Sequence, residues 1–477
     1  MDKLDYDVIV IGAGPTGENV ADRAVKGGLT AAIVESDLVG GECSFWACIP
    51  SKALLRPGLA LEDARNVTGA REAITGKLNA SDVFKRRDYF VSNWNDSSQA
   101  KWLRNAAIDL IRGHGRLAGE RKVVVTNKDG GQKNLTARYA VAICTGTRAS
   151  IPDVPGLAEA RPWTNREAVS ARTVPRRLAI LGGGVVACEM ATLWKQLGTE
   201  EITIIERGPR LIPRNEPFAG DLLKASFEQR GISVLTETTI QRVDRQRDGV
   251  RLTLSNGQTL LADEVLAATG RLPSTRDLGL ESIGLQPGIW LDVDDSMRVK
   301  AVTGDWLYAA GDVNHLALLT HMGKYQARVC GDVIAARAKG KPDASAPGPW
   351  TQYSATADAC AVPQVVFSDP EVAAAGLTEA QAKARGINVR VVDYDIGTVT
   401  GAELYADGYK GHARMVIDQT RGVMVGMTLI GPAVGELIHA ATIAIVGAVP
   451  ISRLWHAVPS FPTISEIWLR LLETAGL

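Results

Sequence analysis

A glycine pattern that occurs twice constrains this chain more than any other feature. In the first copy an apolar run ends at Ile11 and is followed by Gly12, Gly14 and Gly17, and a second apolar run ends at Glu35, 23 residues after Gly12. This order is typical of a βαβ unit that binds a dinucleotide. The glycines permit a tight turn and close backbone approach, and the start of the following helix attracts phosphate.

The same pattern recurs in the middle of the chain. Gly182, Gly184 and Ala187 occupy the glycine positions, and Glu206 follows Gly182 by 24 residues. Because each copy makes one nucleotide-binding unit, the sequence predicts that two dinucleotides bind. The carboxylates of Glu35 and Glu206 would accept hydrogen bonds from ribose 2′-hydroxyls.

The length of 477 residues exceeds what one ordinary hydrophobic core holds, so two to four domains are expected. Apolar strands that end in Thr-Gly at 141–146 and 265–270 mark crossings between domains, and 306–312 adds a further strand that ends in a glycine and an acid. Residues 339–359, rich in Gly, Pro, Ser and Ala, predict a linker. Beyond them, a capping box at Thr378 and Gln381 predicts a short helix in a third, α+β domain.

Composition and charge exclude several classes of partner. The 53 Lys and Arg residues balance 53 Asp and Glu residues, so nucleic acid is not an expected partner. The longest apolar stretch, 437–449, is too short to cross a bilayer, which predicts a buried helix and no membrane association. Six cysteines are too few for a secreted disulfide scaffold, and no basic leader precedes the first strand, so a cytoplasmic location is expected.

The only closely spaced cysteines are Cys43 and Cys48, in the run GGECSFWACIPSK. In a helix an i, i+5 pair is rotated by about 140°, so a disulfide between them requires a distorted turn, and distortion eases reduction. Lys52 lies on the same helical face as Cys48 and would stabilise a nearby anion. No Cys or His cluster completes a set of four ligands, so no metal site is expected.

Several motifs in order give the chain a family resemblance. They are GAGPTG with Glu35, the C-x4-C-I-P-S-K box, GGGVVACE, ATGRLP, AAGD and the C-terminal FPTISE. Over almost its whole length the sequence resembles the FAD-dependent pyridine nucleotide-disulfide oxidoreductases, the group of dihydrolipoamide dehydrogenase, glutathione reductase and mercuric reductase. The resemblance implies an α/β fold with two Rossmann-like dinucleotide-binding domains and a C-terminal α+β dimerisation domain.

The resemblance also implies domain boundaries and a homodimer. The implied segments are 1–152 for the first part of the FAD-binding domain, 153–272 for the NAD(P)-binding domain, 273–345 for the second, central part of the FAD-binding domain and 355–477 for the dimerisation domain. Residues from about 361 onward would form the dimer interface, so that each active site borrows residues from the partner chain.

Roles for individual residues follow from the same resemblance. Cys48 would face the flavin as the charge-transfer thiol, Cys43 would exchange with substrate, and Lys52 and Glu189 would form an ion pair beside flavin N5. FAD would be bound by Gly12, Gly14, Gly17, Glu35 and Asp312, and the nicotinamide dinucleotide by Gly182, Gly184 and Glu206; the other candidate cofactor-binding residues are Ser36, Lys52, Gly115, Thr145, Gly146, Val185, Gly270 and Gly311. NADH is expected to be preferred, with NADPH possible, because Glu206 repels a 2′-phosphate while Arg207 and Arg210 attract it.

The C-terminal motif departs from the family pattern. The family has a His-Pro-Thr run with a Glu that holds the His as general base, whereas this chain has Phe461 in place of the His and keeps Glu466. A phenyl ring transfers no proton, so turnover with a dithiol is expected to be weak. His456 is a substitute base or, more often for such a residue, a surface imidazole.

The cysteine box departs as well. Glu42, Phe45 and Ala47 stand where the family commonly has Thr, Asn and Gly, so bulkier and more acidic surroundings are expected for the cysteine pair. Val185 stands where glutathione reductases have a gating Tyr, which favours the dehydrogenase and mercuric reductase branch.

Three readings of function follow. The first is an NAD(P)H-dependent oxidoreductase that uses Cys43 and Cys48 on a disulfide or another thiol-reactive small-molecule acceptor. Dihydrolipoyl dehydrogenase and mercuric reductase activities are further alternatives. The second is a quinone reductase, or diaphorase, acting directly from the flavin past the apolar Phe461. The third is a dehydrogenase-complex component or redox sensor whose main role is protein binding, for which no lipoyl domain or basic docking patch is visible.

Overall fold

The computed structural model describes residues 4–477, which divide into two compact units. The first unit consists of residues up to 50, 88–148 and 271–358, and the second of 51–87, 149–270 and 359–477. Neither unit is one continuous stretch of chain. The four-segment division implied by the resemblance is finer than these two units and stays a prediction.

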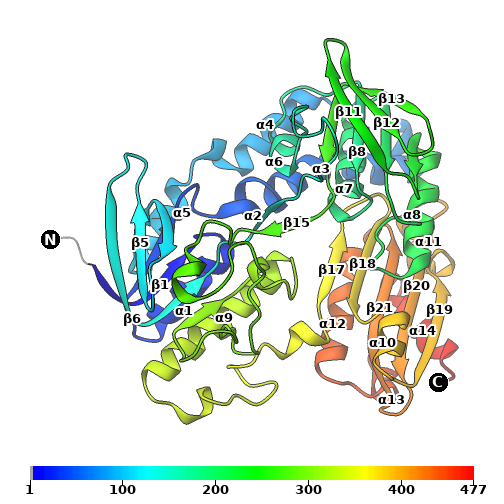
Figure 1. Ribbon diagram of the computed structural model, residues 1–477. Helices are drawn as coiled ribbons and strands as arrows, with labels where there is room; N and C mark the ends of the chain where they lie inside the picture. The colour runs from blue at the N-terminus through cyan, green and yellow to red at the C-terminus, as the bar shows by residue number, and fades with distance from the viewer. Residues whose placement is uncertain (1–3) are drawn as a thin grey trace. The chain divides into compact units, whose positions relative to one another are not determined.

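The first unit is built on a sheet of seven strands (Figure 1). Its order is β3-β2-β1-β6-β5-β4, with β16 paired to β6. The strands β1, β2, β3 and β16 run parallel to their neighbours, while β4 and β5 are antiparallel. The strand bounds are β1 Asp5–Ile11, β2 Ala31–Glu35, β3 Ile108–Arg112, β4 His114–Leu117, β5 Lys122–Thr126, β6 Gln132–Ile143 and β16 Leu307–Ala309.

Two helices of the first unit pack closely through glycines. Helix α1 (Pro15–Lys26) follows the glycine turn and begins with a proline, which is favoured in a first helical turn. Helix α9 (Thr320–Ala338) lies against it, because a Cβ on Gly323 would come within 2.5 Å of Thr16 Oγ1. The start of α9 is thereby fixed beside the start of α1. The unit also contains α2 (Gly41–Phe45) and α5 (Ser97–Asn105).

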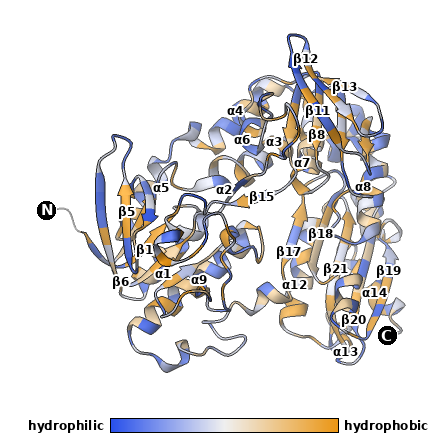
Figure 2. Cartoon of the chain, in the orientation of Figure 1, coloured by the Kyte–Doolittle hydropathy of each residue, from blue (hydrophilic) through white to orange (hydrophobic). Residues whose placement is uncertain are grey.

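The second unit contains a parallel sheet in the order β10-β9-β8-β14. Strand β8 is buried from its second residue onward, and Figure 2 colours the hydrophobic parts of this sheet orange. Helix α7 (Val185–Leu197) follows β8 as α1 follows β1, so the glycine pattern forms the same local structure twice. The remaining bounds are β8 Arg177–Leu181, β9 Glu201–Ile205, β10 Ile232–Leu235, β14 Glu264–Ala267, α6 Asn165–Ser170, α8 Pro217–Gln229, and an antiparallel sheet of β11 Ile240–Gln246, β12 Gly249–Leu254 and β13 Thr259–Ala262.

The C-terminal part of the second unit is an antiparallel sheet of five strands with helices, as the α+β expectation required. The capping box at Thr378 is present and opens α10, which confirms that prediction. The bounds are β17 Pro363–Val366, β18 Glu371–Gly376, β19 Val389–Asp395, β20 His412–Asp418, β21 Val423–Gly431, α10 Glu379–Ala384, α11 Thr400–Tyr405, α12 Ile438–Val446, α13 Ile451–Leu454 and α14 Ile467–Thr474.

The apolar stretch 437–449 does form a helix, α12, but the prediction that it is buried was wrong in part. Ile443 is 58% exposed and Val446 is 41% exposed, whereas Ala441 and Ala444 are buried. One face of α12 packs on the sheet and the other carries apolar side chains at the surface. Hydrophobicity alone does not distinguish a core face from an interface face. Within residues 4–477, none of the helices is both long and apolar enough to span a bilayer.

Candidate active site

The first glycine turn leaves room for a ligand at one position only. Gly12 has φ +102°, and a Cβ there would lie 2.5 Å from the carbonyl oxygen of Cys144; at Gly17 it would lie 1.8 Å from that of Gly12. At Gly14, by contrast, the nearest atom is a Cα 4.0 Å away. The backbone at Gly14 is therefore open to an approaching pyrophosphate, next to the N–H groups that begin α1.

Glu35 is bound to this turn by its own side chain. Its carboxylate accepts hydrogen bonds from the N–H of Ala13 at 2.7 Å and from the N–H of Asp37 at 2.8 Å. Burial raises the pKa of Glu35, and these backbone hydrogen bonds lower it. The carboxylate thus braces the loop while it stands at the end of β2, where a ribose would lie. Ser36 follows it and is exposed.

The end of β6 carries polar groups that fit a bound cofactor. Thr145 Oγ1 is buried and has no hydrogen-bond partner within residues 4–477. Asp312 accepts a hydrogen bond from Thr147 Oγ1 at 2.8 Å, and Arg271 Nε donates to the same hydroxyl at 2.6 Å. Burial raises the pKa of Asp312, and the bond from Thr147 lowers it. An orphaned hydroxyl beside an open glycine turn fits the polar groups of a dinucleotide.

Three further glycines of the predicted cofactor set belong to this unit. Gly146 and Gly311 have φ values of +64° and +81°, a conformation that favours glycine. Gly115 lies in β4, where a Cβ would approach Val34 Cγ1 to 3.0 Å. These glycines are therefore required by the backbone conformation or by close packing. They lie in the same unit as Gly12 and Glu35.

The cysteine pair lies at a break between two helices. Helix α2 ends at Phe45 and α3 (Cys48–Arg65) begins at Cys48, with Trp46 and Ala47 between them. The predicted distorted turn is therefore present. Both cysteines are free thiols that hydrogen-bond to each other, and this bond, followed by burial, raises the pKa of Cys43.

Helix α9 contacts both sulfur atoms. Thr320 Oγ1 lies 3.3 Å from Cys48 Sγ, and the same hydroxyl bonds to Cys43 and lowers its pKa. Lys324, one turn further along α9, also lowers the pKa of Cys43 through its charge. The first turn of α9 thus partly opposes the rise in the pKa of Cys43 that the bond to Cys48 and burial cause.

The negative charge of Glu42, close to the cysteines in sequence, is compensated by a cation. Its Oε2 lies 3.4 Å from Arg271 Nη2, so the extra acidity expected from the sequence is offset by a cation. Phe45 is almost fully buried, and its carbonyl accepts a hydrogen bond from Trp94 Nε1 at 3.2 Å. The bulky side chain at this position is therefore buried, and the bond from Trp94 to the backbone holds the end of α2.

The second glycine turn repeats the arrangement of the first. Gly182 has φ +99°, and a Cβ on Gly184 would meet nothing within 4 Å. Glu206 accepts hydrogen bonds from the N–H of Gly183 at 2.5 Å and from the N–H of Gly208 at 2.6 Å. Both oxygens of Glu206 are therefore held by backbone at the end of β9, as those of Glu35 are at the end of β2. The other predicted residues here, Val185 and Gly270, begin α7 and follow β14.

Lys52 and Glu189 form the predicted ion pair, within the second unit. Lys52 Nζ lies 2.6 Å from Glu189 Oε2, and the other oxygen of Glu189 accepts from the N–H of Phe367 at 3.2 Å. The ammonium of Lys52 also lies 4.7 Å from the centroid of the Phe367 ring. Glu189 is buried, and the ion pair with Lys52 offsets the cost of removing its carboxylate from water.

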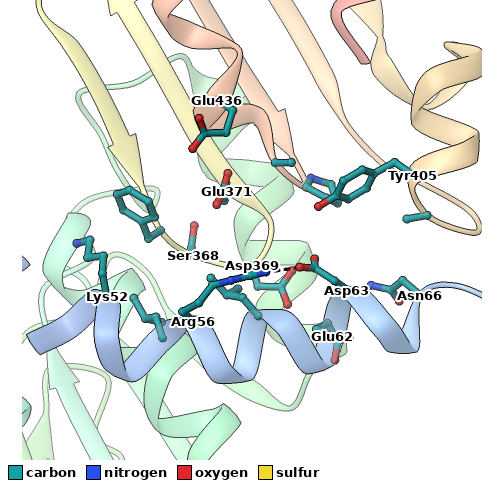
Figure 3. A pocket seen from close by; sticks show the side chains of 16 residues that line it. Lys52, Arg56, Glu62, Asp63, Asn66, Ser368, Asp369, Glu371, Tyr405 and Glu436 are labelled. Atoms are coloured by element: carbon teal, nitrogen blue, oxygen red, sulfur yellow. Dashed lines mark hydrogen bonds and ion pairs between the residues drawn. The ribbon is translucent and has the colours of Figure 1, made fainter. Parts of the chain in front are cut away.

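Lys52 stands at one end of a cavity of about 480 Å³ between α3 and the loop after β17 (Figure 3). Its wall carries five carboxylates, and burial raises the pKa of one of them, Asp369, to about 6. Arg230 pairs with Asp369 at 2.9 Å, and Arg56 with Asp63 at 3.1 Å. The five acidic residues are Glu62, Asp63, Asp369, Glu371 and Glu436.

The C-terminal motif has no base at its first position. Phe461 is 72% exposed, and His456 lies at the surface. Glu466 is buried, and its Oε1 accepts a hydrogen bond from Arg470 Nη2 at 2.5 Å. An arginine therefore partners the carboxylate to which the resemblance assigns a histidine.

The structure thus places the predicted residues in two groups. The cysteines, the first glycine turn and Asp312 lie in the first unit; Lys52, Glu189, Glu206 and Glu466 lie in the second. Sequence reasoning missed Thr320, Lys324 and Arg271. Their signal was weak, since Thr320 and Lys324 only flank a histidine in LTHMGK and Arg271 stands inside ATGRLP without a role of its own.

Comparisons with known proteins agree with this arrangement. A family model described as pyridine nucleotide-disulphide oxidoreductase matches residues 6–340, and its dimerisation domain matches residues 362–471. Dihydrolipoyl dehydrogenase of Chlorobaculum tepidum is 32% identical, covering 97% of this chain and 95% of its own, and mercuric reductase of Staphylococcus aureus is 29% identical, covering 97% and 81%.

A solved structure shows the same fold. It is the Cu(II) complex of the HOCl-induced flavoprotein disulfide reductase RclA from Escherichia coli, with a TM-score of 0.83 and 23% identity over 99% of both chains. The dimerisation domain, together with the apolar side chains exposed on α12, suggests a homodimer. The chain belongs to the pyridine nucleotide-disulphide oxidoreductases, a family of FAD- and NAD(P)H-dependent enzymes.

Proposed function

We propose that this protein passes electrons from NADH, through FAD, to the Cys43–Cys48 disulfide and on to a small disulfide or thiol-reactive acceptor. For a disulfide acceptor the balanced reaction consumes one NADH, one proton and one disulfide, and yields NAD⁺ and two thiols. FAD, when bound, carries two electrons between the nicotinamide and the cysteine pair. The Cys43–Cys48 pair, set at the break between α2 and α3 with Thr320 against Cys48, carries the proposal.

The cofactor roles rest on the two glycine turns. We assign FAD to the first, because the open backbone at Gly14, the orphaned Thr145 hydroxyl and the buried Asp312 belong to the unit that holds the cysteines. We assign the nicotinamide dinucleotide to the second glycine turn. Glu206 holds a negative charge there, which disfavours a 2′-phosphate, and NADH is therefore the proposed donor.

The remaining roles concern the second unit. Lys52 and Glu189 are proposed to act as a pair beside the flavin, since Lys52 follows Cys48 by one turn of α3. Glu466 is proposed to orient the C-terminal segment through Arg470 rather than through a histidine. The acceptor is proposed to be a small molecule and the active assembly a homodimer. A cytoplasmic location stays a prediction from the cysteine usage, which cell fractionation checks.

The test is an acceptor panel with NADH, run on the wild type and on Cys43→Ser. The panel contains disulfides, quinones and ferricyanide, which takes electrons directly from reduced flavin. Disulfide reduction should be lost in Cys43→Ser while ferricyanide reduction stays within about twofold, because only the first uses the interchange thiol. Equal disulfide rates in both proteins would refute the proposal.

A second candidate function has its own supporting observation. Phe461 is an apolar ring, 72% exposed, at the position where the family carries its base. An aromatic wall suits a flat quinone better than a dithiol, so quinone reduction directly from the flavin is the alternative. It would be favoured if quinones give the highest kcat/KM in the panel and Cys43→Ser leaves that value unchanged.

A further inference from the structure

The cysteine pair forms a disulfide readily only if α2 and α3 keep a set orientation to each other. Cys43 lies within α2 and Cys48 begins α3, with Trp46 and Ala47 between the helices. A disulfide requires a Cα separation of about 4.4 to 6.8 Å, so a movement of either helix end changes how easily the bond forms. Helix α2 has only five residues, too few to be stable alone, and other segments must therefore hold it.

Residues 92–96 bind the backbone on both sides of α2. Before the helix, Asp96 Oδ2 accepts a hydrogen bond from the N–H of Val39 at 2.8 Å. After the helix, Trp94 Nε1 donates a hydrogen bond to the carbonyl oxygen of Phe45 at 3.2 Å. All of these residues belong to the first unit. We call residues 92–96 the α2 clamp, because they hold α2 at its two ends.

Trp94 also contacts the break between α2 and α3. Its ring centroid lies 5.8 Å from that of Trp46, and the two ring planes are tilted by 31°. Trp46 caps the end of α2 and stands inside the C-x4-C box, between the two cysteines. The indole of Trp94 therefore meets the break at two points, the carbonyl of Phe45 and the ring of Trp46.

Asp96 binds the approach to α2 instead of capping its own helix. It stands at the N-cap of α5, where an Asp side chain ordinarily accepts from the backbone of the helix, yet it makes no such bond. Its Oδ2 accepts instead from Val39 and from Arg112 Nη2, the latter at 2.6 Å. Arg112 Nη1 in turn donates to the carbonyl oxygen of Asp37 at 2.9 Å. The loop that leads into α2 is thus fixed by both side chains.

The backbone of the α2 clamp is strained. Ser92, Asn93 and Trp94 have φ values of +49°, +51° and +57°, a left-handed run that contains no glycine. Each such residue costs free energy relative to the right-handed region, and a bulky side chain is a rare outlier there. Strain of this kind persists only where surrounding contacts determine the conformation, and it is concentrated at functional sites. The contacts here are the buried side chain of Val91 before the run and the bonds to α2.

We propose that the α2 clamp positions Cys43 for disulfide formation, and that Trp94 thereby sets the equilibrium between the Cys43–Cys48 disulfide and the two thiols. By fixing the end of α2, the clamp keeps one thiol close to the other and raises its effective concentration. The clamp therefore stabilises the disulfide and lowers its midpoint potential. Trp94 is a positioning residue, because it acts through the backbone of Phe45. The proposal rests on the proposed function, since it concerns the redox centre of that reaction.

The experiment measures this equilibrium in the FAD-bound protein. Enzyme is equilibrated without oxygen in mixtures of oxidised and reduced dithiothreitol. As the S–S bond between Cys43 and Cys48 forms, the two thiols lose two electrons and two protons, and oxidised dithiothreitol gains both as its own S–S bond breaks. Acid quenching, alkylation of the free thiols and mass spectrometry of the peptide that contains both cysteines give the oxidised fraction.

Trp94→Phe tests the hydrogen bond, because it keeps a ring and removes the N–H donor. It should lower the equilibrium constant for disulfide formation about 10-fold, which raises the midpoint potential by about 30 mV. Trp102→Phe is the control. It removes an exposed indole from α5 and should leave the constant unchanged.

Two substitutions at Asn93 test the placement of Trp94 by the strained run. The side chain of Asn93 is exposed, so the two variants differ mainly in backbone preference. Asn93→Gly adopts a positive φ at little cost and should keep the wild-type constant. Asn93→Val does not fit this region and should lower the constant as Trp94→Phe does.

Asp96 offers a conservative rescue at the other end of α2. Asp96→Asn keeps an oxygen that accepts from the N–H of Val39, whereas Asp96→Ala leaves this N–H without its acceptor. The constant should therefore fall further in Asp96→Ala than in Asp96→Asn. Equal constants in the two variants would contradict the role of Asp96 in the clamp.

The outcomes are distinct. A constant in Trp94→Phe that stays within about twofold of the wild type, or that rises, overturns the proposal. Where Trp94→Phe does not retain FAD, which absorbance shows, the Asn93 variants decide: a lower constant in Asn93→Val alone supports the clamp, and equal constants in both overturn it. If Cys43→Ser still reduces disulfides, the proposed function itself fails. If Cys43→Ser is inactive and the Trp94 and Asn93 variants keep the wild-type constant, only the clamp is wrong.

Discussion

Glu466 and Arg470 form a hydrogen-bonded ion pair of 2.5 Å across the junction of the 3₁₀ turn Ile464–Glu466 and α14. Only one carboxylate oxygen takes part. The other oxygen, Oε2, is buried and has no hydrogen-bond partner within residues 4–477. The arginine therefore fixes the carboxylate and leaves one acceptor available.

That available oxygen makes Phe461→His a gain-of-function test. If Glu466 Oε2 orients the new imidazole, the ring supplies the base that the motif lacks, and dihydrolipoamide oxidation should rise by about 10-fold or more. Steady-state rates with NAD⁺ measure the effect, and Phe461→Leu is the control that should show no gain. No rise in a correctly folded Phe461→His would mean that the surroundings of Glu42 and Phe45 limit the reaction.

Both cysteines should be redox-active. Anaerobic titration with dithionite should consume four electrons per subunit, two for the flavin and two for the disulfide, with a long-wavelength charge-transfer band midway. Cys48→Ser should take up two electrons and show no band, because it lacks the thiolate that is proposed to face the flavin. Cys43→Ser should show the band in its oxidised form. Two-electron uptake without a band in the wild type would contradict the assignment.

The ion pair of Lys52 and Glu189 should matter for stability as well as for flavin reduction. Lys52→Met leaves the buried Glu189 carboxylate without its cation, at a cost of about 3 kcal/mol in the free energy of unfolding. Urea denaturation of the FAD-bound protein measures it. Lys52→Met with Glu189→Gln should recover most of the loss, since no unpaired charge remains; equal loss in the single and double variants would argue against an ion-pair effect.

Asp358 should make the protein less stable as the pH rises. Burial raises its pKa to about 7, the side chain of Gln326 lowers it, and Asp295 raises it. Because the folded pKa exceeds the unfolded value, the protonated carboxyl stabilises the fold fully below about pH 4, and this contribution is lost as the pH rises to about 7.

Asp358→Asn removes this titration. The variant should be more stable than the wild type above pH 7, by up to about 4 kcal/mol for a shift of about three units, and nearly equal to it at pH 4. Chemical denaturation at the two pH values gives the comparison. An identical stability difference at both would show that Asp358 does not titrate in this range.

The choice between NADH and NADPH should depend on Glu206. Wild-type kcat/KM should favour NADH by at least about 10-fold, and Glu206→Ala should lower this preference, because the neighbouring Arg207 and Arg210 then act on the 2′-phosphate unopposed. The same substitution also removes two hydrogen bonds to the turn, so the KM for NADH should rise. A wild-type preference for NADPH would overturn the assignment.

Local patterns predicted the local structure well. The two glycine turns, the acids that end the second strand of each unit and the capping box at Thr378 all depend on residues close together in sequence. Steric rules that act over a few residues determine such features. The break between α2 and α3 was predictable for the same reason, since an i, i+5 cysteine pair does not fit a regular helix.

Contacts between distant segments were not predictable in this way. Thr320 reaches Cys48 across 272 residues, and Arg271 reaches Thr147 across 124. Both contacts depend on the way in which α9 and β15 (Arg271–Pro273) pack into the first unit. The spacing of apolar residues along the sequence does not encode this packing. The prediction that α12 is wholly buried failed for another reason. An apolar residue gives the same sequence signal in a core and in an interface.

The alternation of the two units along the chain has a consequence for biosynthesis. The first unit takes its strands β1 and β6 from early segments but its β16, Asp312 and α9 from residues 271–358, with two long segments of the other unit in between. A ribosome must therefore deliver about three-quarters of the polypeptide before the proposed FAD site has all its parts. Until then the apolar edge of β6 and the face of α1 that contacts α9 remain exposed to solvent. This nascent intermediate is therefore the stage that is most prone to aggregation and depends most on chaperones.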